Sequence, residues 1–436
     1  MLDESVDKMR LVIDILLCLI CLPQIADPCC IRLTNTFPTI RNRGIPGPQG
    51  PQGPAGSWCG YTSVTNTDFT TDGKEGSPTT QTFTIDSPGW YLLCESISFQ
   101  GSSGNETAIS IQSNNVTIDF NELSLTTADT IPTKGIVIEG GYSNIKIRGN
   151  GAIAGFRQYG IHANGSSSNN ISDVSISYMK LFNMTSNSNA TGLYVSYCNK
   201  CSVSDSLIYN NKRGLDCRNN NTVTLRNSTI TKNNNNGGAY LKDCSIVKIE
   251  KSIFNNNQYA SGNHLELHIE NGNDTTIDEC VFHNYLTGLS NNLYSLYTKS
   301  CNGLTIKNNS FTHAVTNNGS SIYLDTVTKG IIDNNNFLRS SASGTANGIE
   351  LTSSQKIIIS CNQMSHYNTA VYINSPQTPI TSSIYNNKFF YNTNVYNSFP
   401  GINAAFIEAT GTPHNLTGLT DAKVYENIII QEDQSS

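Results

Sequence analysis

Short runs of alternating apolar and polar residues recur along most of the chain, separated by corners rich in Asn, Ser and Gly. One copy contains the alternating run Val223–Leu225, a polar corner with the apolar residue Ile230, an Asn-rich turn and a second alternating run at Ala239–Leu241. The pattern then begins again at Val247. Because alternation with a period of two places apolar side chains on one face of a strand, each copy predicts short strands joined by tight corners.

Eleven copies of this unit can be aligned, with starts 22–29 residues apart. They begin at Val116, Ile145, Val174, Cys201, Val223, Val247, Thr275, Leu304, Gly330, Ile357 and Ser382. Two residues after each start lies Ile, Val or Leu. One unit has too few apolar residues to fill a core, whereas stacked units bury a continuous one, so the loose period predicts a solenoid.

A polar column and an apolar column indicate the type of solenoid. The polar column, five residues after each start, consists of Asn121, Asn150, Met179, Ser206, Ser228, Ser252, Cys280, Asn309, Asn335, Asn362 and Asn387. The apolar column, two residues further on, consists of Leu123, Ala152, Leu181, Ile208, Ile230, Phe254, Phe282, Phe311, Phe337, Met364 and Phe389. Amides stacked ~4.8 Å apart can hydrogen-bond along the stack, so the polar column predicts an internal ladder.

Together these columns resemble the right-handed parallel β-helix of the pectin-lyase-like superfamily. The resemblance covers about three quarters of the chain and implies an all-β, right-handed parallel β-helix solenoid of about 11–12 coils. It implies no single activity, because the superfamily includes lyases, hydrolases, phage tailspikes, adhesins and structural fibres.

The N-terminal segments differ in composition from the repeats. Residues 1–26 contain the apolar run Leu11–Leu22, which is too short for a transmembrane helix and is typical of a signal peptide or an N-terminal hydrophobic segment. Residues 27–57 form a linker, and its Gly-X-Y triplets at 44–56 resemble collagen. Three such segments would associate into a homotrimer, and a stiff polyproline spacer is the alternative.

The remaining boundaries follow the strand pattern. Residues 58–112 are β-rich and predict an N-terminal cap or first coil, because an uncovered solenoid end exposes strand edges. Residues 113–412 form the β-helix, and residues 413–436 form a C-terminal cap or tail.

Charge and cysteine content exclude some functions. A net charge of −6 and the absence of a basic block argue against a nucleic-acid partner. The 13 cysteines include one CxxC pair, Cys198 and Cys201, without a second CxxC or a His pair to complete a metal site. We therefore interpret these cysteines as buried thiols and predict neither a metal nor a cofactor.

The second strand of each copy carries the candidate ligand-binding residues. Its outward positions predict a face on which Tyr alternates with charged residues, and Tyr rings suit stacking on sugars. The candidate ligand-binding residues are His162, Tyr194, Tyr240, His268, Tyr297, Lys299, Tyr323 and Tyr372. The alternative is that Tyr simply favours exposed strand positions.

The middle coils of this face carry the candidate catalytic residues. Asp216 and Glu266 are placed on outward positions two coils apart, ~9.6 Å at strand spacing, near the upper limit for an inverting glycosidase pair. Arg218 or Lys242 is the candidate base of a lyase. Against both, the paired Asp and the Gly-His-Gly of polygalacturonases are absent, and neighbouring opposite charges also pair simply to stabilise a sheet.

These patterns lead to three hypotheses of function. The first is a secreted or surface-displayed fibre or adhesin-type protein, of virion or envelope origin, that binds carbohydrate along one strand face. The second is a polysaccharide lyase or glycoside hydrolase acting on an acidic or complex polysaccharide. The third is a structural spacer without a ligand.

Overall fold

The computed structural model describes residues 60–430, except 72, 75–77, 103–105, 128–130, 132, 186–189, 260–263, 285–291, 314–317, 340–345, 375–381, 391, 393, 399–405 and 411–422. The chain divides into residues 1–57 and residues 58–436, and the described residues belong to the second unit. The signal-like segment and the Gly-X-Y triplets therefore lie outside the described residues.

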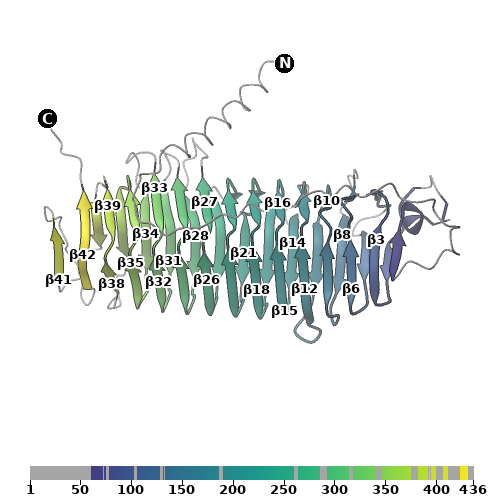
Figure 1. Cartoon of the computed structure of the whole chain (residues 1–436), viewed down its shortest axis with the longest axis horizontal. Coiled ribbons are helices and arrows are strands. Elements are labelled where there is room, and N and C mark those ends of the chain that lie inside the picture. Colours follow the sequence, from purple (N-terminus) through teal and green to yellow (C-terminus); the bar gives the residue numbers. More distant parts are fainter. Residues whose placement is uncertain are drawn as a thin grey trace, which may run out of the picture. The chain divides into compact units, whose positions relative to one another are not determined.

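Three rows of parallel strands form the described part of the chain (Figure 1). The first row contains β1 (Tyr61–Val64), β3 (Gly89–Leu93), β6 (Val116–Asp119), β9 (Ile145–Arg148), β12 (Ile171–Ser177), β15 (Cys198–Ser204), β18 (Thr222–Arg226), β22 (Ile246–Glu250), β26 (Asp274–Asp278), β29 (Leu304–Lys307), β32 (Gly330–Asp333), β35 (Ile357–Ser360) and β38 (Ser383–Tyr385). The second row contains β4 (Ile97–Ser98), β7 (Ser124–Thr126), β10 (Ala152–Ala154), β13 (Lys180–Phe182), β16 (Leu207–Tyr209), β19 (Thr229–Thr231), β23 (Ile253–Asn255), β27 (Val281–Asn284), β30 (Ser310–His313), β33 (Asn336–Arg339), β36 (Gln363–Ser365) and β39 (Lys388–Phe390). These two rows, with β41 (Phe406–Thr410) and β42 (Lys423–Ile430), form one sheet of 27 strands.

The third row is a separate sheet of 13 strands. It contains β2 (Phe83–Ile85), β5 (Glu106–Ile111), β8 (Thr133–Glu139), β11 (Tyr159–Asn164), β14 (Thr191–Ser196), β17 (Arg213–Arg218), β21 (Ala239–Lys242), β25 (His264–Glu270), β28 (Asn292–Lys299), β31 (Asn318–Asp325), β34 (Asn347–Thr352), β37 (Thr369–Asn374) and β40 (Asn394–Ser398). A small sheet joins β20 (Asn234–Asn235) to β24 (Gln258–Tyr259).

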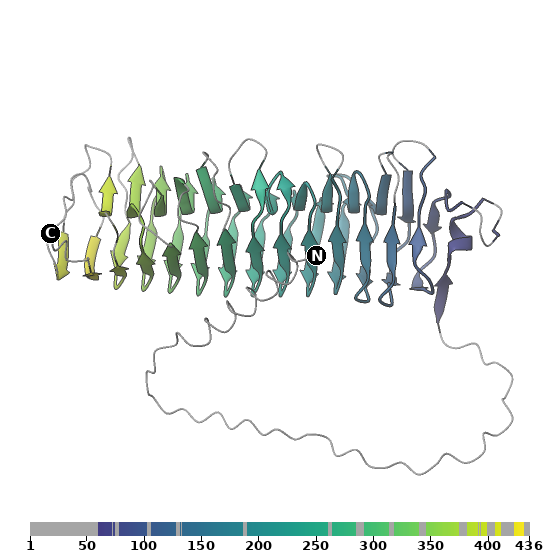
Figure 2. The same ribbon diagram turned by 90° about the horizontal axis from the view of Figure 1, so that it is seen from above.

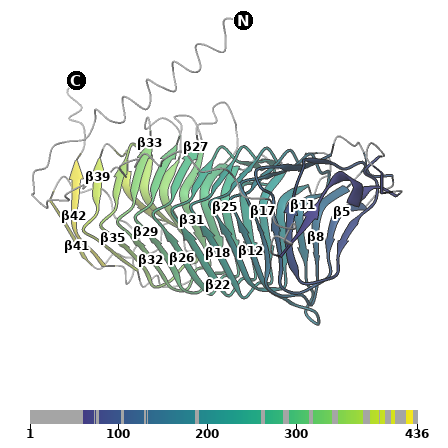
Figure 3. The same ribbon diagram turned by 45° about the vertical axis from the view of Figure 1, so that its right-hand side comes forward.

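The prediction of an all-β parallel solenoid is confirmed. Among the described residues the helical element is one 3₁₀ turn, Asn66–Phe69, and no helix there is long and apolar enough to cross a membrane. Figures 2 and 3 show successive coils stacked strand over strand along the solenoid. The predicted register also holds, since Val174 pairs with Cys201, Cys201 with Val223 and Val223 with Val247.

The predicted apolar column fills the core of the solenoid. Phe254, Phe282, Phe311 and Phe337 are fully buried, and their rings stack at centroid distances of 5.0, 4.8 and 4.8 Å with interplanar angles of 5–6°. Such parallel stacking follows directly from coil-on-coil register, which repeats the same side chain at the same place.

The predicted polar ladder is confirmed in the C-terminal coils. Asn309 donates from its backbone N–H and from Nδ2 to Oδ1 of Asn335, both at 2.9 Å, and Asn335 makes the same pair of bonds to Asn362. The pattern continues through Asn387 to Asn427 in the last described strand. We call Asn309, Asn335, Asn362, Asn387 and Asn427 the C-terminal ladder. It gives buried backbone groups at one corner their partners.

Two positions assigned to this ladder are wrong. Asn121 and Asn150 are exposed and have left-handed backbone angles, with φ of 49° and 55°. In these two coils the buried residue of the second row is Leu125 or Ile153, one or two residues later than predicted. The corners are therefore longer, and Asn occupies a turn position, where it tolerates the left-handed region.

Candidate functional site

The outward side chains of the 13-stranded sheet form a row that is largely aromatic. Strand register aligns His162, Tyr194, Asp216, Tyr240, His268, Tyr297, Tyr323, Glu350 and Tyr372. We call this the aromatic row. His268 lies between Tyr240 and Tyr297, at ring-centroid distances of 4.9 and 4.6 Å. The outward face predicted for these strands is therefore present, except that His268 lies where Glu266 was expected.

The change concerns Glu266, which was placed outward and is buried. Register aligns Tyr240 with His268, so His268 takes the place expected for Glu266, and Glu270 takes the place expected for His268. Glu266 is 0% exposed and accepts hydrogen bonds from the backbone N–H of Asn257, at 3.1 Å, and from its Nδ2. The prediction that Glu266 faces outward is therefore wrong.

The physical reason is a break in alternation at the start of each third-row strand. Gly214 and Leu215 are adjacent, yet both are buried inside the coil. A Cβ on Gly214 would lie 2.8 Å from Nδ2 of Asn233, and one on Gly238 would lie 2.7 Å from Nδ2 of Asn257. Two successive inward positions therefore precede the aromatic row, and the first of them is glycine because an asparagine side chain fills its space.

These asparagines form a second internal ladder that sequence reasoning missed. The backbone N–H of Asn211 donates to Oδ1 of Asn233 at 3.0 Å, and that of Asn233 donates to Oδ1 of Asn257 at 3.1 Å. Asn257 then donates to Glu266, whose carboxylate ends the series. We call Asn211, Asn233, Asn257 and Glu266 the central ladder. Its sequence signal is an Asn three residues after Ile208, Ile230 and Phe254.

The same break in alternation places a second column of side chains outward, which the sequence pattern did not predict. Tyr159, Arg213, Leu265 and Tyr294 each lie three residues before a member of the aromatic row. Tyr159 stacks on His162 at 4.3 Å, and Tyr294 lies 5.2 Å from Tyr323. The aromatic surface is thus wider than one column.

At the centre of the row two arginines surround Asp216. This residue is 2% exposed although it points outward. Arg218 donates from Nε to Oδ1 at 2.8 Å and from Nη2 to Oδ2 at 2.9 Å, and Nη1 of Arg213 also donates to Oδ2. Arg213 further donates from Nε to the carbonyl oxygen of Asn236 at 3.2 Å. A bidentate guanidinium–carboxylate contact of this kind is strong and geometrically specific.

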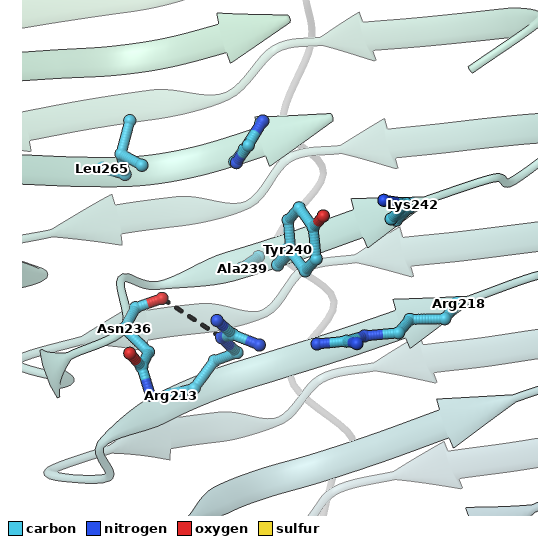
Figure 4. A pocket seen from close by; sticks show the side chains of 8 residues that line it. Arg213, Arg218, Asn236, Ala239, Tyr240, Lys242 and Leu265 are labelled. Atoms are coloured by element: carbon cyan, nitrogen blue, oxygen red, sulfur yellow. Dashed lines mark hydrogen bonds between the residues drawn. The ribbon is translucent and has the colours of Figure 1, made fainter. Parts of the chain in front are cut away.

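A pocket of about 270 Å³ opens beside this cluster (Figure 4). Its lining consists of Arg213, Arg218, Asn236, Ala239, Tyr240, Lys242, Leu265 and His268. Asn236 directly follows β20, and β20 pairs with β24. The small two-stranded sheet therefore positions the side of the pocket that contains Asn236. The surface beside Asp216 is therefore concave.

Tyr240 lies between the cationic and anionic groups of the pocket. The centroid of its ring is 5.1 Å from Cζ of Arg213 and 5.3 Å from Cζ of Arg218, which are cation–π distances. Its hydroxyl donates to Oε2 of Glu270 at 2.6 Å, and Nζ of Lys242 lies 3.1 Å from Oε1 of Glu270. Burial and the hydrogen bond to Glu270 raise the pKa of Tyr240, so the phenol stays protonated.

His268 is also held in one charge state. Burial lowers its pKa to about 4, so the imidazole is neutral at pH 7. His162 behaves in the same way, with burial lowering its pKa to about 4. Both rings therefore contribute as neutral aromatic surfaces.

The candidate catalytic residues do not come together as expected. Asp216 lies on the outer face, Glu266 lies inside the coil, and no ligand can lie between their carboxylates. Arg218 and Lys242 do line one pocket, as the outward columns implied. Lys299 is exposed next to this region, in register with Glu270, while Tyr323 and Tyr372 continue the row toward the C-terminal coils.

Most of the cysteines that the structure describes lie in the core, while Cys94 and Cys361 are exposed. Cys198, Cys201, Cys217, Cys244, Cys280 and Cys301 are buried as free thiols. Among the residues that the structure describes, no cluster of three or more His, Cys, Asp or Glu side chains is placed to hold a metal ion.

Among the comparisons with known proteins, a family model supports the fold. A family model described as a right handed beta helix region matches residues 134–266. A solved periplasmic alginate epimerase variant is 13% identical with a TM-score of 0.49, over 79% of each chain. The A-module of a mannuronan C-5 epimerase from Azotobacter vinelandii is 12% identical with a TM-score of 0.45, over 85% of this chain and 88% of the other.

A bacteriophage tailspike is also similar. This E. coli phage protein, solved with a pentasaccharide, is 13% identical with a TM-score of 0.38, over 80% of this chain and 60% of the tailspike. No curated protein sequence matches the chain. At such identities the likeness concerns the backbone and not the side chains of a site, so function has to be argued from the residues themselves.

Proposed function

We propose that this protein binds a polysaccharide along the outward face of its 13-stranded sheet. The observation that carries the proposal is the aromatic row, in which rings from successive coils pack against one another beside a polar pocket at Tyr240 and His268. Aromatic rings provide apolar area for the faces of sugar rings, and nearby polar groups can bond their hydroxyls.

Binding is favoured over cleavage by the state of the polar groups. Asp216 is already bonded to two guanidinium groups, and Glu266 has no access to a ligand outside the coil. A general acid or base works best with a pKa near the operating pH. Neither Tyr240, whose pKa is raised, nor His268, with a pKa of about 4, meets that condition.

The proposal also includes location and assembly. Residues 1–26 support secretion or display on a cell or virion surface, and the Gly-X-Y triplets at 44–56 support a homotrimer. A trimer would increase avidity for a repeating polymer, because each chain would present the same face.

The test is a glycan array read in parallel for release of reducing ends. We expect binding without release. Tyr297→Ala should weaken binding by on the order of 1 kcal/mol through lost stacking. Tyr178→Ala is the matched control, because this Tyr is 57% exposed outside the 13-stranded sheet.

Three results would contradict the proposal. Release of reducing ends that Asp216→Ala abolishes would make the protein an enzyme. Binding that is insensitive to Tyr297→Ala but lost on changing Lys146 and Lys248 would move the site to the other sheet. No binding to any glycan on the array would favour the hypothesis that the protein is a structural spacer without a ligand.

A further inference from the structure

We infer that Asp216 is a positioning residue that holds Arg213 and Arg218 as a receptor for an oxyanion carried by the bound polysaccharide. This inference rests on the proposed function, because it concerns the same pocket. It goes further by naming a charged substituent as the group that the central pocket selects.

The geometry shows why Asp216 orients both guanidinium groups. It fixes Arg218 through two bonds at 2.8 and 2.9 Å and accepts a third bond from Arg213. Arg213 is fixed from a second direction by the carbonyl oxygen of Asn236 at 3.2 Å. A planar guanidinium with two bonded nitrogens has few remaining rotamers, so little entropy is lost when it binds a ligand.

Each guanidinium retains donor capacity toward the pocket. The bonds above use Nε and Nη1 of Arg213, and Nε and Nη2 of Arg218. Within the described part of the chain, Nη2 of Arg213 and Nη1 of Arg218 have no hydrogen-bond partner, and both side chains line the pocket. Figure 4 shows the two arginines extending toward each other on the same side of Tyr240.

The charges and the aromatic ring favour an anion at this place. Arg213, Arg218 and Lys242 outnumber the carboxylates of Asp216 and Glu270 by one, in a chain whose net charge is −6. The ring of Tyr240 lies at cation–π distance from both guanidinium groups, and the side chains of Arg213 and Arg218 are 14% and 38% exposed. Charged hydrogen bonds are stronger in such a setting than in open solvent.

A carboxylate, a sulfate ester and a phosphate ester share the chemistry that this pair recognises. Each offers two or more oxygens to guanidinium donors. A neutral polymer offers only hydroxyl and ether oxygens to these donors, and hydrogen bonds to such neutral acceptors are weaker than those to an oxyanion, which favours the charged ligand.

The experiment uses the full-length protein and polymers in charged and neutral pairs. Dextran sulfate is compared with dextran, and polygalacturonate with its methyl ester, by biolayer interferometry. We expect the charged member of at least one pair to bind about tenfold more tightly or better, the gain for one charged hydrogen bond. The pair that discriminates identifies sulfate or carboxylate as the preferred group.

The variant Asp216→Asn distinguishes positioning of the two arginines from nonspecific attraction between the protein and a charged polymer. The substitution keeps the shape and makes the protein more positive, so nonspecific attraction would strengthen binding of the charged polymer. If Asp216 positions the arginines, binding instead weakens about tenfold. The matched control is Asp173→Asn, which removes the same charge from the other sheet, where Asp173 pairs with Lys200.

A second variant covers failure of Asp216→Asn to fold. Arg218→Lys keeps the charge but loses the bidentate fork, so it should also weaken binding of the charged polymer, and its melting temperature shows whether the variant is folded. Charged and neutral polymers that bind equally, or tighter binding by Asp216→Asn, would overturn the inference and leave the proposed function intact. If no polymer and no glycan binds, both the inference about the oxyanion and the proposed function are wrong.

Discussion

The C-terminal ladder and the central ladder do the same structural work but end differently. In both, an amide oxygen accepts the backbone N–H of the preceding coil at 2.9–3.1 Å. The C-terminal ladder consists of amides through Asn427, so it is uncharged. The central ladder ends at Glu266, a carboxylate with no exposure, on the strand that also carries Leu265 and His268 of the pocket.

The difference shows how a solenoid accommodates a functional region. Amide ladders satisfy buried backbone groups at no cost in charge, which suits coils that only need to stack. At the end of the central ladder the carboxylate of Glu266 accepts from the backbone N–H and Nδ2 of Asn257, as the amide oxygen of Asn257 does from those of Asn233. The result is a titratable group directly behind the binding face.

The largest expected effect comes from breaking the uncharged ladder. Asn335→Leu removes the acceptor of the backbone N–H and of Nδ2 of Asn309. The backbone N–H of Asn309 and one of the two N–H bonds of its Nδ2 then lack an acceptor, while Nδ2 keeps its bond to the carbonyl oxygen of Ile277. The loss should cost about 3 kcal/mol in the free energy of unfolding, measured by chemical denaturation. The adjacent Asn336→Leu is the control, because Asn336 is exposed, and it should change little. Equal stability of both variants would mean that the ladder is not internal.

A smaller loss is expected from overpacking the central ladder. In Gly214→Ala the added Cβ would lie 2.5 Å from the carbonyl oxygen of Gly238 and 2.8 Å from Nδ2 of Asn233. Forcing these groups apart should cost about 1–3 kcal/mol. Gly330→Ala is the matched control, since its closest neighbour is a movable side-chain atom of Ile357 at 3.0 Å. Thermal unfolding that ranks Gly330→Ala below Gly214→Ala would contradict the packing of this ladder.

The sharpest distinction between the two ladders is expected from Glu266→Gln, because its effect depends on pH. Burial raises the pKa of Glu266 from 4.5 to about 8. Between these values the folded protein keeps a proton that the unfolded chain releases, so stability falls as the pH rises from 4.5 through 8. The glutamine variant resembles the protonated form and should lose this part of the slope.

Denaturation at several pH values between 5 and 9 checks this expectation. Glu250→Gln, which removes a carboxylate from the first-row strand β22, is the control and should keep the wild-type slope. A Glu266→Gln profile parallel to wild type would show that the carboxylate is ionised in the folded protein throughout the range.

Much of the solenoid followed from the sequence because its signals are local and repeated. Register was predictable from Val174, Cys201 and Val223, since stacking aligns equivalent positions of successive coils. The Asn309–Asn335 contact was predictable for the same reason. The prediction was wrong at Asn121 and Asn150, because their corners are longer by two residues and one residue, so the buried side chains that follow are Leu125 and Ile153.

The site was less predictable. The sequence placed Tyr240, Tyr297 and Lys242 on one face, because simple alternation holds over those residues. It placed Glu266 outside because strict alternation was assumed at the start of the strand, where two adjacent residues both face inward. The repeating Gly214 and Gly238 mark that point, and they would have indicated that Glu266, in the same column, faces inward too.

The sequence by itself determined the coil, its register and its amide corner, since a repeating pattern of side chains leaves only one way to stack. Only the tertiary structure decided whether the carboxylates of Asp216 and Glu266 face outward or inward and which groups they contact. Both are carboxylates on third-row strands of the middle coils, and their roles differ because one meets Arg213 and Arg218 outside the sheet and the other meets Asn257 within it. Arg213 and Arg218 lie on the same strand as Asp216, whereas Asn257 precedes Glu266 by nine residues and reaches it inside the coil. The charge state and access of each carboxylate depend on these neighbours in space.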